Sequence, residues 1–167
     1  CLPGIDMSTG SLGQGISSAV GMALAGKLDK KDYRVYTILG DGELEEGQVW
    51  EAAMCAAHYK LNNLTAFVDF NGLQIDGNIE EVMNPSPIDK KFEAFGWNAL
   101  VIDGHNYDEI IDAIEKARNC KDMPTVIVCK TIKGKGVSFM ENDAGWHGVA
   151  PSKEQCEKAL AEIGGNR

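Results

Sequence analysis

Hydrophobic and polar positions along this chain follow two patterns, which alternate from one segment to the next. Short apolar runs of five or six residues, rich in Val, Ile, Thr and Phe, have the length and composition of buried β-strands. Longer segments between them repeat their apolar residues every three or four positions, as one face of an α-helix does. The predicted strands are 34–39, 65–70, 98–102 and 125–129, and the predicted helices are 11–28, 47–59, 88–95, 107–118 and 153–163.

Strands that alternate with helices predict the α/β class, with a doubly wound parallel sheet and helices on both of its faces. The reason is that parallel strands need a crossover connection, and a helix is the usual one. With 167 residues, 44% of them hydrophobic, the chain is long enough for one domain with a core. No repeat, low-complexity segment or linker divides it, so one domain is predicted over residues 1–167.

Two segments depart from these simple patterns. Helix 11–28 is rich in Gly, Ala and Ser, although Gly costs about 1 kcal/mol relative to Ala inside a helix. A close approach of the sheet or of a partner chain would explain its small residues. Residues 72–88 have no strong periodicity and contain two prolines, which predicts a long loop over one edge of the sheet.

Composition limits the function classes. The 25 acidic and 16 basic residues give a net charge of −9, which opposes nonspecific binding to nucleic acid and to anionic membranes. No apolar run approaches the roughly 20 residues of a membrane span, and no signal-peptide pattern is visible. The five cysteines form no C-x-x-C pair, as expected for simple thiols of a cytosolic protein.

The candidate chemistry follows two neighbouring strands. Gly40-Asp41-Gly42 ends the first predicted strand and Asn71 ends the second, with one helix between them. Parallel strands of such a unit end at the same edge of the sheet, where open α/β sheets bind ligands. Asp41 alone could cap the following helix, but a carboxylate and an amide oxygen together suit Mg²⁺ or Ca²⁺. The sequence therefore predicts a metal-bound diphosphate at this edge.

The sequence motifs around these residues resemble those of transketolase, in particular the amino-terminal subunit of the two-chain bacterial kind. GDG…N is the thiamine diphosphate signature of that family, and six words occur in family order over nearly the whole chain. They are Gly10-Ser-Leu-Gly-Gln-Gly15, Gly40-Asp-Gly-Glu-Leu-Glu-Glu-Gly47, Asn71-Gly-Leu73, Asp103-Gly-His105, Lys130-Thr-Ile-Lys-Gly-Lys-Gly136 and Trp146-His-Gly148.

The resemblance implies a set of site residues. Asp41, Asn71 and the carbonyl of Leu73 would bind the metal, and Asn71 and the N–H of Gly42 would contact the cofactor's diphosphate. Gly10, Ser11 and Leu12 would contact its rings, with Ser11 standing where many relatives have proline. The Gly10 word has the order G-x-x-G-x-G and follows no strand, which argues against a dinucleotide loop.

Other charged residues are assigned by the same resemblance. His147 would reach the diphosphate and the substrate and is the candidate catalytic residue, and Lys133 would reach a phosphate. Glu46 matches an acidic residue at the family's dimer interface, although a carboxylate that only stabilises the start of the helix explains it nearly as well. His58 is expected to be structural and His105 to be a turn residue.

The implied activity is that of transketolase in the pentose phosphate pathway of the cytoplasm. A glycolaldehyde unit would pass from a ketose phosphate to an aldose phosphate, with thiamine diphosphate and a divalent metal as cofactors. The family's leading segment, with its histidines, is missing before Cys1, and no glutamate for the aminopyrimidine ring is found. The chain should therefore supply the metal–diphosphate half of the site and be inactive alone. It would need a C-terminal subunit carrying the pyrimidine-binding domain, in a homodimer or heterotetramer.

Two alternatives stay open at the level of sequence. The first is another thiamine diphosphate enzyme, such as 1-deoxyxylulose-5-phosphate synthase or a 2-oxoacid dehydrogenase first component. The second is a non-catalytic binding or assembly module of the same fold.

Overall fold

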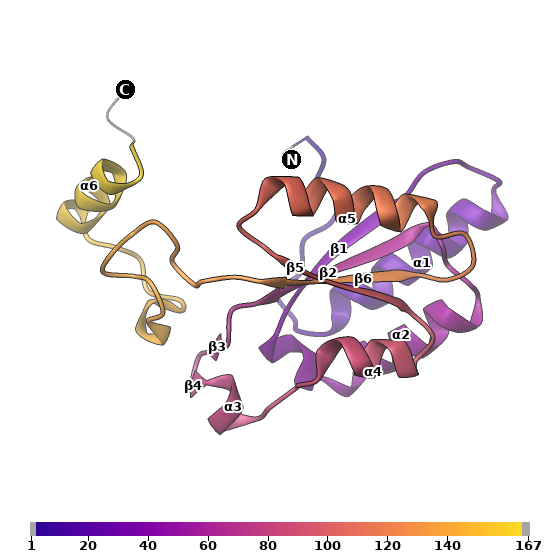
Figure 1. The fold of residues 1–167 in the computed structure, drawn as a ribbon, viewed down its shortest axis with the longest axis horizontal. Coiled ribbons are helices and arrows are strands. Elements are labelled where there is room, and N and C mark those ends of the chain that lie inside the picture. Colours follow the sequence, from indigo (N-terminus) through magenta and orange to yellow (C-terminus); the bar gives the residue numbers. More distant parts are fainter. Residues whose placement is uncertain (1–2, 165–167) are drawn as a thin grey trace.

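A computed structural model describes residues 3–164 of the chain. Four parallel strands form one sheet in the order β1-β2-β6-β5, and β3 and β4 form a small antiparallel hairpin (Figure 1). The strands are β1 Val35–Gly40, β2 Leu64–Phe70, β3 Leu73–Gln74, β4 Gly77–Asn78, β5 Asn98–Asp103 and β6 Thr125–Lys130. The predicted parallel α/β sheet is confirmed.

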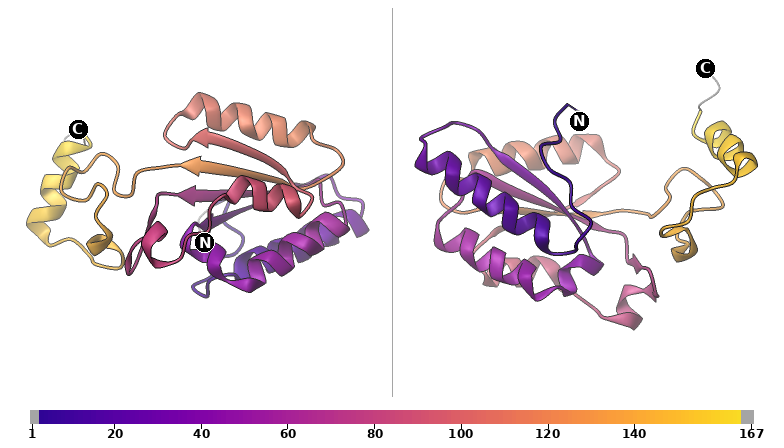
Figure 2. Two further views of the ribbon diagram at one scale, coloured as in Figure 1. Left: turned by 60° about the horizontal axis from the view of Figure 1, so that its bottom comes forward. Right: turned by 180° about the vertical axis from the view of Figure 1, so that it is seen from behind.

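Helices cover both faces of the sheet, as predicted. Helices α1, α2 and α4 lie on one face and α5 lies on the other (Figures 1 and 2). The helical segments are α1 Gln14–Leu28, η1 Gly42–Glu45, α2 Gly47–His58, α3 Ile79–Val82, α4 Ile88–Ala94, α5 Tyr107–Asn119, η2 Ala144–Trp146 and α6 Lys153–Glu162. The connection from β5 to β6 runs back across the sheet, so its helix must take the opposite face to keep a right-handed crossover.

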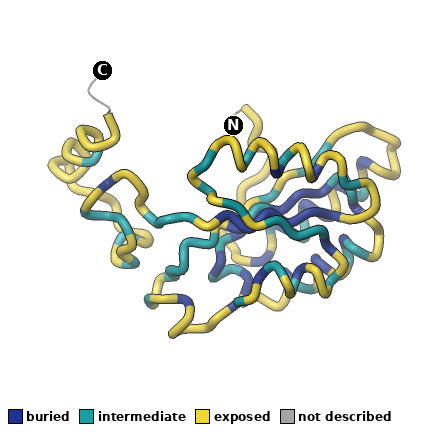
Figure 3. The backbone as a smooth tube through the Cα atoms, viewed as in Figure 1, coloured by how far each residue is buried: buried dark blue, intermediate teal, exposed yellow. Residues whose placement is uncertain are grey.

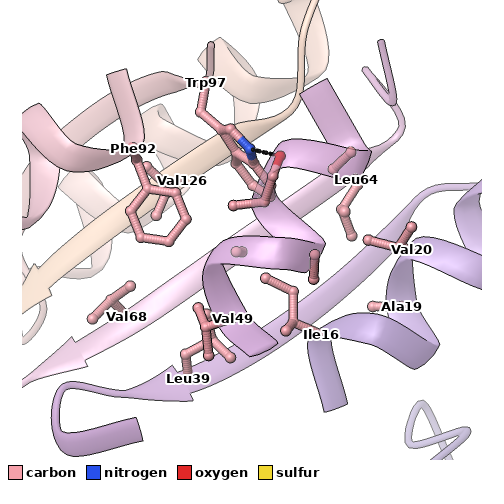
Figure 4. Packing of buried hydrophobic residues seen from close by; sticks show 14 of the residues in the cluster. Ile16, Ala19, Val20, Leu39, Val49, Leu64, Val68, Phe92, Trp97 and Val126 are labelled. Carbon is pink, nitrogen blue, oxygen red and sulfur yellow. Dashed lines mark hydrogen bonds between the residues drawn. The ribbon is translucent and has the colours of Figure 1, made fainter. Parts of the chain in front are cut away.

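The larger part of the core lies between the sheet and helices α1, α2 and α4 (Figure 4). Trp97 is buried there, and its indole Nε1 donates to the carbonyl of Ala53 at 2.9 Å. The Phe92 ring packs against Trp50 and Trp97, with centroids 5.0 and 5.3 Å away. Because an indole N–H needs a partner when buried, this hydrogen bond fixes the start of β5 against α2.

One of the small residues of α1, Gly26, has a packing reason. Gly26 is buried, and a Cβ placed on it would lie 2.8 Å from the ring of Tyr33. The Tyr33 hydroxyl donates to the carbonyl of Met22 at 2.8 Å, which holds the ring across the last turns of the helix. At Gly26 the close approach is that of a tyrosine ring of the same chain, not of the sheet or of a partner chain as expected.

The segment 72–88 is more ordered than the loop that was predicted. It contains the hairpin β3–β4 and the short helix α3, whose cap is the Asn78 side chain accepting from Glu80 N at 2.9 Å. Elements of two to four residues are too short to show a hydrophobic period, which explains why the sequence did not reveal them.

Residues 131–164, called the arm below, leave the sheet beyond the end of β6 (Figure 1). Trp146 packs edge-on against Phe139 with centroids 5.4 Å apart, and its Nε1 donates to the Phe139 carbonyl at 2.8 Å. Helix α6 begins with a capping box between Ser152 and Gln155. The tube in Figure 3 shows that most of the arm is exposed.

One half of the α5 face remains open. Helix α5 packs on β5, while Ile38 of β1 is 76% exposed, and Tyr36 and Phe67 lie beside it with their rings 6.4 Å apart. No helix among residues 3–164 has the length and apolar composition needed to cross a membrane. The described cysteines, Cys55, Cys120, Cys129 and Cys156, are free thiols, and Cys1 lies outside the described residues.

Candidate functional site

The carboxyl ends of β1 and β2 bring Asp41 and Asn71 to one edge of the sheet. The two strands pair in parallel with Gly40 opposite Asp69, and Asp41 N donates to the Asp69 carbonyl at 3.2 Å. The helix between them, α2, starts a few residues after Asp41 and returns the chain to the other end of the sheet. This is the juxtaposition that the βαβ pattern predicts.

The Asp41 carboxylate is the most deeply buried acidic group at this edge, with 2% of the residue exposed. One of its oxygens accepts from Gly42 N at 2.9 Å and the other from Gly72 N at 2.7 Å. Burial raises the pKa of Asp41 above its ordinary value and the Asp69 carboxylate adds to this, while the backbone N–H groups of Gly72, Gly42 and Asn71 lower it. None of the ion pairs found within residues 3–164 includes Asp41.

The loop after β2 carries Asn71 and leads into Leu73 of β3, the two residues whose oxygens the sequence predicts as further ligands. Asn71 Oδ1 accepts from Leu73 N at 3.1 Å, and the Gly72 carbonyl accepts from Ile79 N at 2.9 Å. Gly72 has φ +77°, a left-handed conformation that glycine adopts without strain. Within residues 3–164 no three His, Cys, Asp or Glu side chains group as metal ligands. A cation at this edge would therefore depend on the mixed set of Asp41, Asn71 and the Leu73 carbonyl.

Gly42 lies against the Gln74 side chain, which would have to shift to admit a Cβ. A Cβ at this position would be 2.9 Å from Gln74 Oε1 and 3.3 Å from Gln74 Cβ. Its N–H, expected to bind a diphosphate, donates here to Asp41, so a bound diphosphate would compete with Asp41 for this donor. The element that starts at Gly42 is a four-residue 3-10 helix, and the predicted α-helix follows it as α2.

Glu43 is a site residue that the sequence reasoning missed. Its carboxylate accepts from Gly13 N at 2.9 Å and from Gly40 N at 3.1 Å. It thereby ties the loop before α1 to the end of β1. The sequence signal that could have revealed Glu43 is its position directly after Gly40-Asp41-Gly42, inside the motif 40–47.

The loop that Glu43 holds contains Gly10, Ser11 and Leu12. These three residues are exposed, and Leu12 presents 57% of its surface to solvent at the start of α1. An exposed leucine at this edge is suited to pack against the flat rings of a ligand.

No hydrogen bond or ion pair found within residues 3–164 joins Lys133 or His147 to the candidate ligands at Asp41, Asn71 and Leu73. Both lie on the arm, where Lys133 O accepts from Asn142 N at 3.0 Å and His147 N donates to Ala144 O at 2.9 Å. Glu46 is exposed at the start of α2. Burial raises the pKa of its neighbour Glu45, and the Asp41 and Glu46 carboxylates raise it further. Asp41, Glu45 and Glu46 thus place several acidic groups near this edge.

Comparison with known proteins gives the family. A family model described as "Transketolase, thiamine diphosphate binding domain" matches residues 1–166. The chain belongs to the transketolase family. It is 50% identical over 160 residues to the 6-deoxy-6-sulfo-D-fructose transketolase subunit SqwG of Clostridium sp. (strain MSTE9), covering 96% of this chain and 58% of that protein.

A second sequence relative and a solved structure also match the chain. An apulose-4-phosphate transketolase subunit of Phocaeicola vulgatus is 45% identical over 162 residues, with 97% of this chain and 58% of that protein covered. The crystal structure of transketolase from Campylobacter jejuni matches with a TM-score of 0.85 and 35% identity, over 96% of this chain and 26% of that one. The chain therefore spans little more than half the length of the two subunits that it matches.

Proposed function

We propose that this chain binds thiamine diphosphate through a divalent cation, Mg²⁺ or Ca²⁺, at the carboxyl edge of its sheet. The Asp41 carboxylate, the Asn71 amide oxygen and the Leu73 carbonyl would supply three oxygen ligands of the kind these cations prefer. The observation that carries the proposal is the buried Asp41 carboxylate, which no cationic side chain within residues 3–164 pairs with. A bound cation would remove this unfavourable charge.

The neighbouring residues would hold the rest of the cofactor. Gly42 and Asn71 would donate to the diphosphate. The backbone of Gly10 and Ser11 and the exposed side chain of Leu12 would contact the rings.

Lys133 and His147 would reach the diphosphate from the arm. Lys133 would contribute positive charge there. His147 would hydrogen-bond to the diphosphate or the substrate, which makes it the candidate catalytic residue. Thiamine diphosphate, when bound, supplies the chemistry that breaks and remakes the carbon–carbon bond.

The proposed reaction is the transfer of a glycolaldehyde unit from a ketose phosphate to an aldose phosphate. Two relatives are named as subunits, one for a sulfonated fructose and one for apulose 4-phosphate, which supports a sugar-derived donor and a partner chain. The partner would carry the pyrimidine-binding domain and complete the site between chains. The free thiols are compatible with a reducing compartment such as the cytoplasm.

Isothermal titration of thiamine diphosphate in the presence of Mg²⁺ tests the binding step. We expect saturable binding to the chain that requires the metal and is lost in Asp41→Ala. Asp32→Ala, which removes an exposed carboxylate from the turn after α1, is the matched control and should bind like the wild type. Equal binding by wild type and Asp41→Ala would contradict the proposed site.

A further inference from the structure

His105 makes a contact that its position in a turn does not predict. It lies between β5 and α5, and its ring nitrogen Nε2 accepts from Ile132 N at 2.8 Å. The turn itself is fixed, because His105 N donates to Asp103 Oδ1 and Gly104 N donates to the Lys130 carbonyl, each at 2.8 Å. The ring is therefore held at the point where the arm begins.

The turn also packs directly on the start of the arm. A Cβ on Gly104 would lie 2.5 Å from Thr131 Cγ2 and 2.9 Å from Cys129 Cβ. Thr131 is tied to β2 on the other side, because its N–H donates to the Phe70 carbonyl at 3.1 Å and its hydroxyl donates to Asp69. Residues 131 and 132 are thus held from two sides, by β2 and by the His105 ring.

Beyond Ile132 the arm holds only to itself among the described residues. Every hydrogen bond found for residues 133–164 has its partner within residues 132–164, including the bonds of Ser138 to Glu162 and of Gly136 to Glu141. The attachments at Thr131 and Ile132 consequently set the direction in which the whole arm leaves the sheet.

We propose that His105 is a positioning residue for the proposed cofactor site. Its hydrogen bond to Ile132 directs the arm so that Lys133 and His147 reach a diphosphate held at Asp41. The role requires the neutral ring with its proton on Nδ1, because only an unprotonated Nε2 can accept. This inference rests on the proposed function, since the arm has a target only if the diphosphate binds.

Two variants of His105 separate a hydrogen-bonding role from a filling role. His105→Leu fills similar space with an apolar side chain but removes the acceptor, whereas His105→Gln keeps an acceptor at similar reach. His58→Leu, at an exposed histidine at the end of α2, is the control for loss of a histidine as such. Each is compared with the wild type and with Asp41→Ala.

The first measurement is amide hydrogen exchange at Ile132 in the chain without ligand. Loss of one hydrogen bond should speed exchange about tenfold in His105→Leu, and His105→Gln should restore protection. The second is titration with thiamine diphosphate and Mg²⁺. We expect about tenfold weaker binding by His105→Leu, near wild-type binding by His105→Gln, and no change in His58→Leu.

The outcomes distinguish this inference from the function on which it rests. Unchanged exchange at Ile132 in His105→Leu would overturn the hydrogen bond as a restraint on the arm. Faster exchange with unchanged affinity would overturn the positioning role, while binding that is lost in Asp41→Ala would still support the proposed function. No binding by the wild type would overturn the proposed function and the positioning role together, and the exchange result would still decide whether His105 restrains the arm.

Discussion

At the scale of single residues, Asp41 is held in a place where its charge is unfavourable. The fold surrounds its carboxylate with backbone N–H groups but buries it, and the net effect raises its pKa. A group that the fold stabilises in its neutral form lowers stability once it ionises. The ionised Asp41 carboxylate therefore lowers stability, and the cation proposed at this site would offset that cost.

The pH dependence of stability should reveal this. Because the folded pKa of Asp41 is raised, its stabilising contribution is full below the unfolded value of about 3.9 and is lost as the pH rises through the folded value. In metal-free buffer the wild type should lose free energy of unfolding relative to Asp41→Asn over this window, by about 1.4 kcal/mol for each unit of increase in pKa. Urea denaturation of both proteins across pH measures it, and a difference independent of pH would contradict the argument.

At the scale of elements, α1 shows two different uses of glycine. Gly26 faces the Tyr33 ring and has no space for a methyl group, whereas Gly21 is exposed with nothing within 4 Å of an added Cβ. The first glycine is required by packing. The second only lowers the helical propensity of the segment.

Alanine substitutions at these two positions should act in opposite directions. Gly26→Ala forces the Tyr33 ring away and should lower the free energy of unfolding by about 1–3 kcal/mol. Gly21→Ala should raise it by about 0.4–1 kcal/mol, since the unfolded chain loses freedom and the helix gains propensity. Denaturant titration of both variants provides the comparison, and a Gly26→Ala protein as stable as the wild type would refute the packing role.

At the scale of the whole molecule, the candidate site lies at one open edge of the sheet. Asp41, Asn71 and the Gly10 loop converge there, while the arm projects beyond the edge with most of its surface exposed (Figure 3). The α5 face is also open beside Ile38. These open surfaces agree with a chain that the proposed function assigns to a larger assembly.

Mixing experiments should therefore restore a catalytic activity that the isolated chain lacks. With a ketose phosphate, an aldose phosphate, thiamine diphosphate and Mg²⁺, we expect no steady-state turnover until a candidate C-terminal subunit is added. Activity should then rise to saturation with the added subunit. The Asp41→Ala chain with the same subunit is the control and should stay inactive, and turnover by the wild-type chain alone would contradict the division of the site.

The sequence by itself determined the main strands and helices of the fold and the edge at which the candidate site lies. Buried strands such as Thr125–Lys130 and the helices between them follow from local periods, which each segment carries within its own residues. Asp41 and Asn71 could be placed together because parallel strands joined by one helix must end at the same edge. The family followed from ordered words, and the comparisons confirm it.

Only the tertiary structure decided how the parts of the site are held. The carboxylate of Glu43 joins two loops 30 residues apart, and the His105 ring reaches Ile132 across 27 residues. The Tyr33 ring explains why residue 26 is a glycine. The hairpin β3–β4 orders a segment whose sequence shows no hydrophobic period. The Glu43 and His105 contacts join residues distant in the chain, which leave no mark on the local pattern of polar and apolar residues. The hairpin is local, but its strands are too short to show a period.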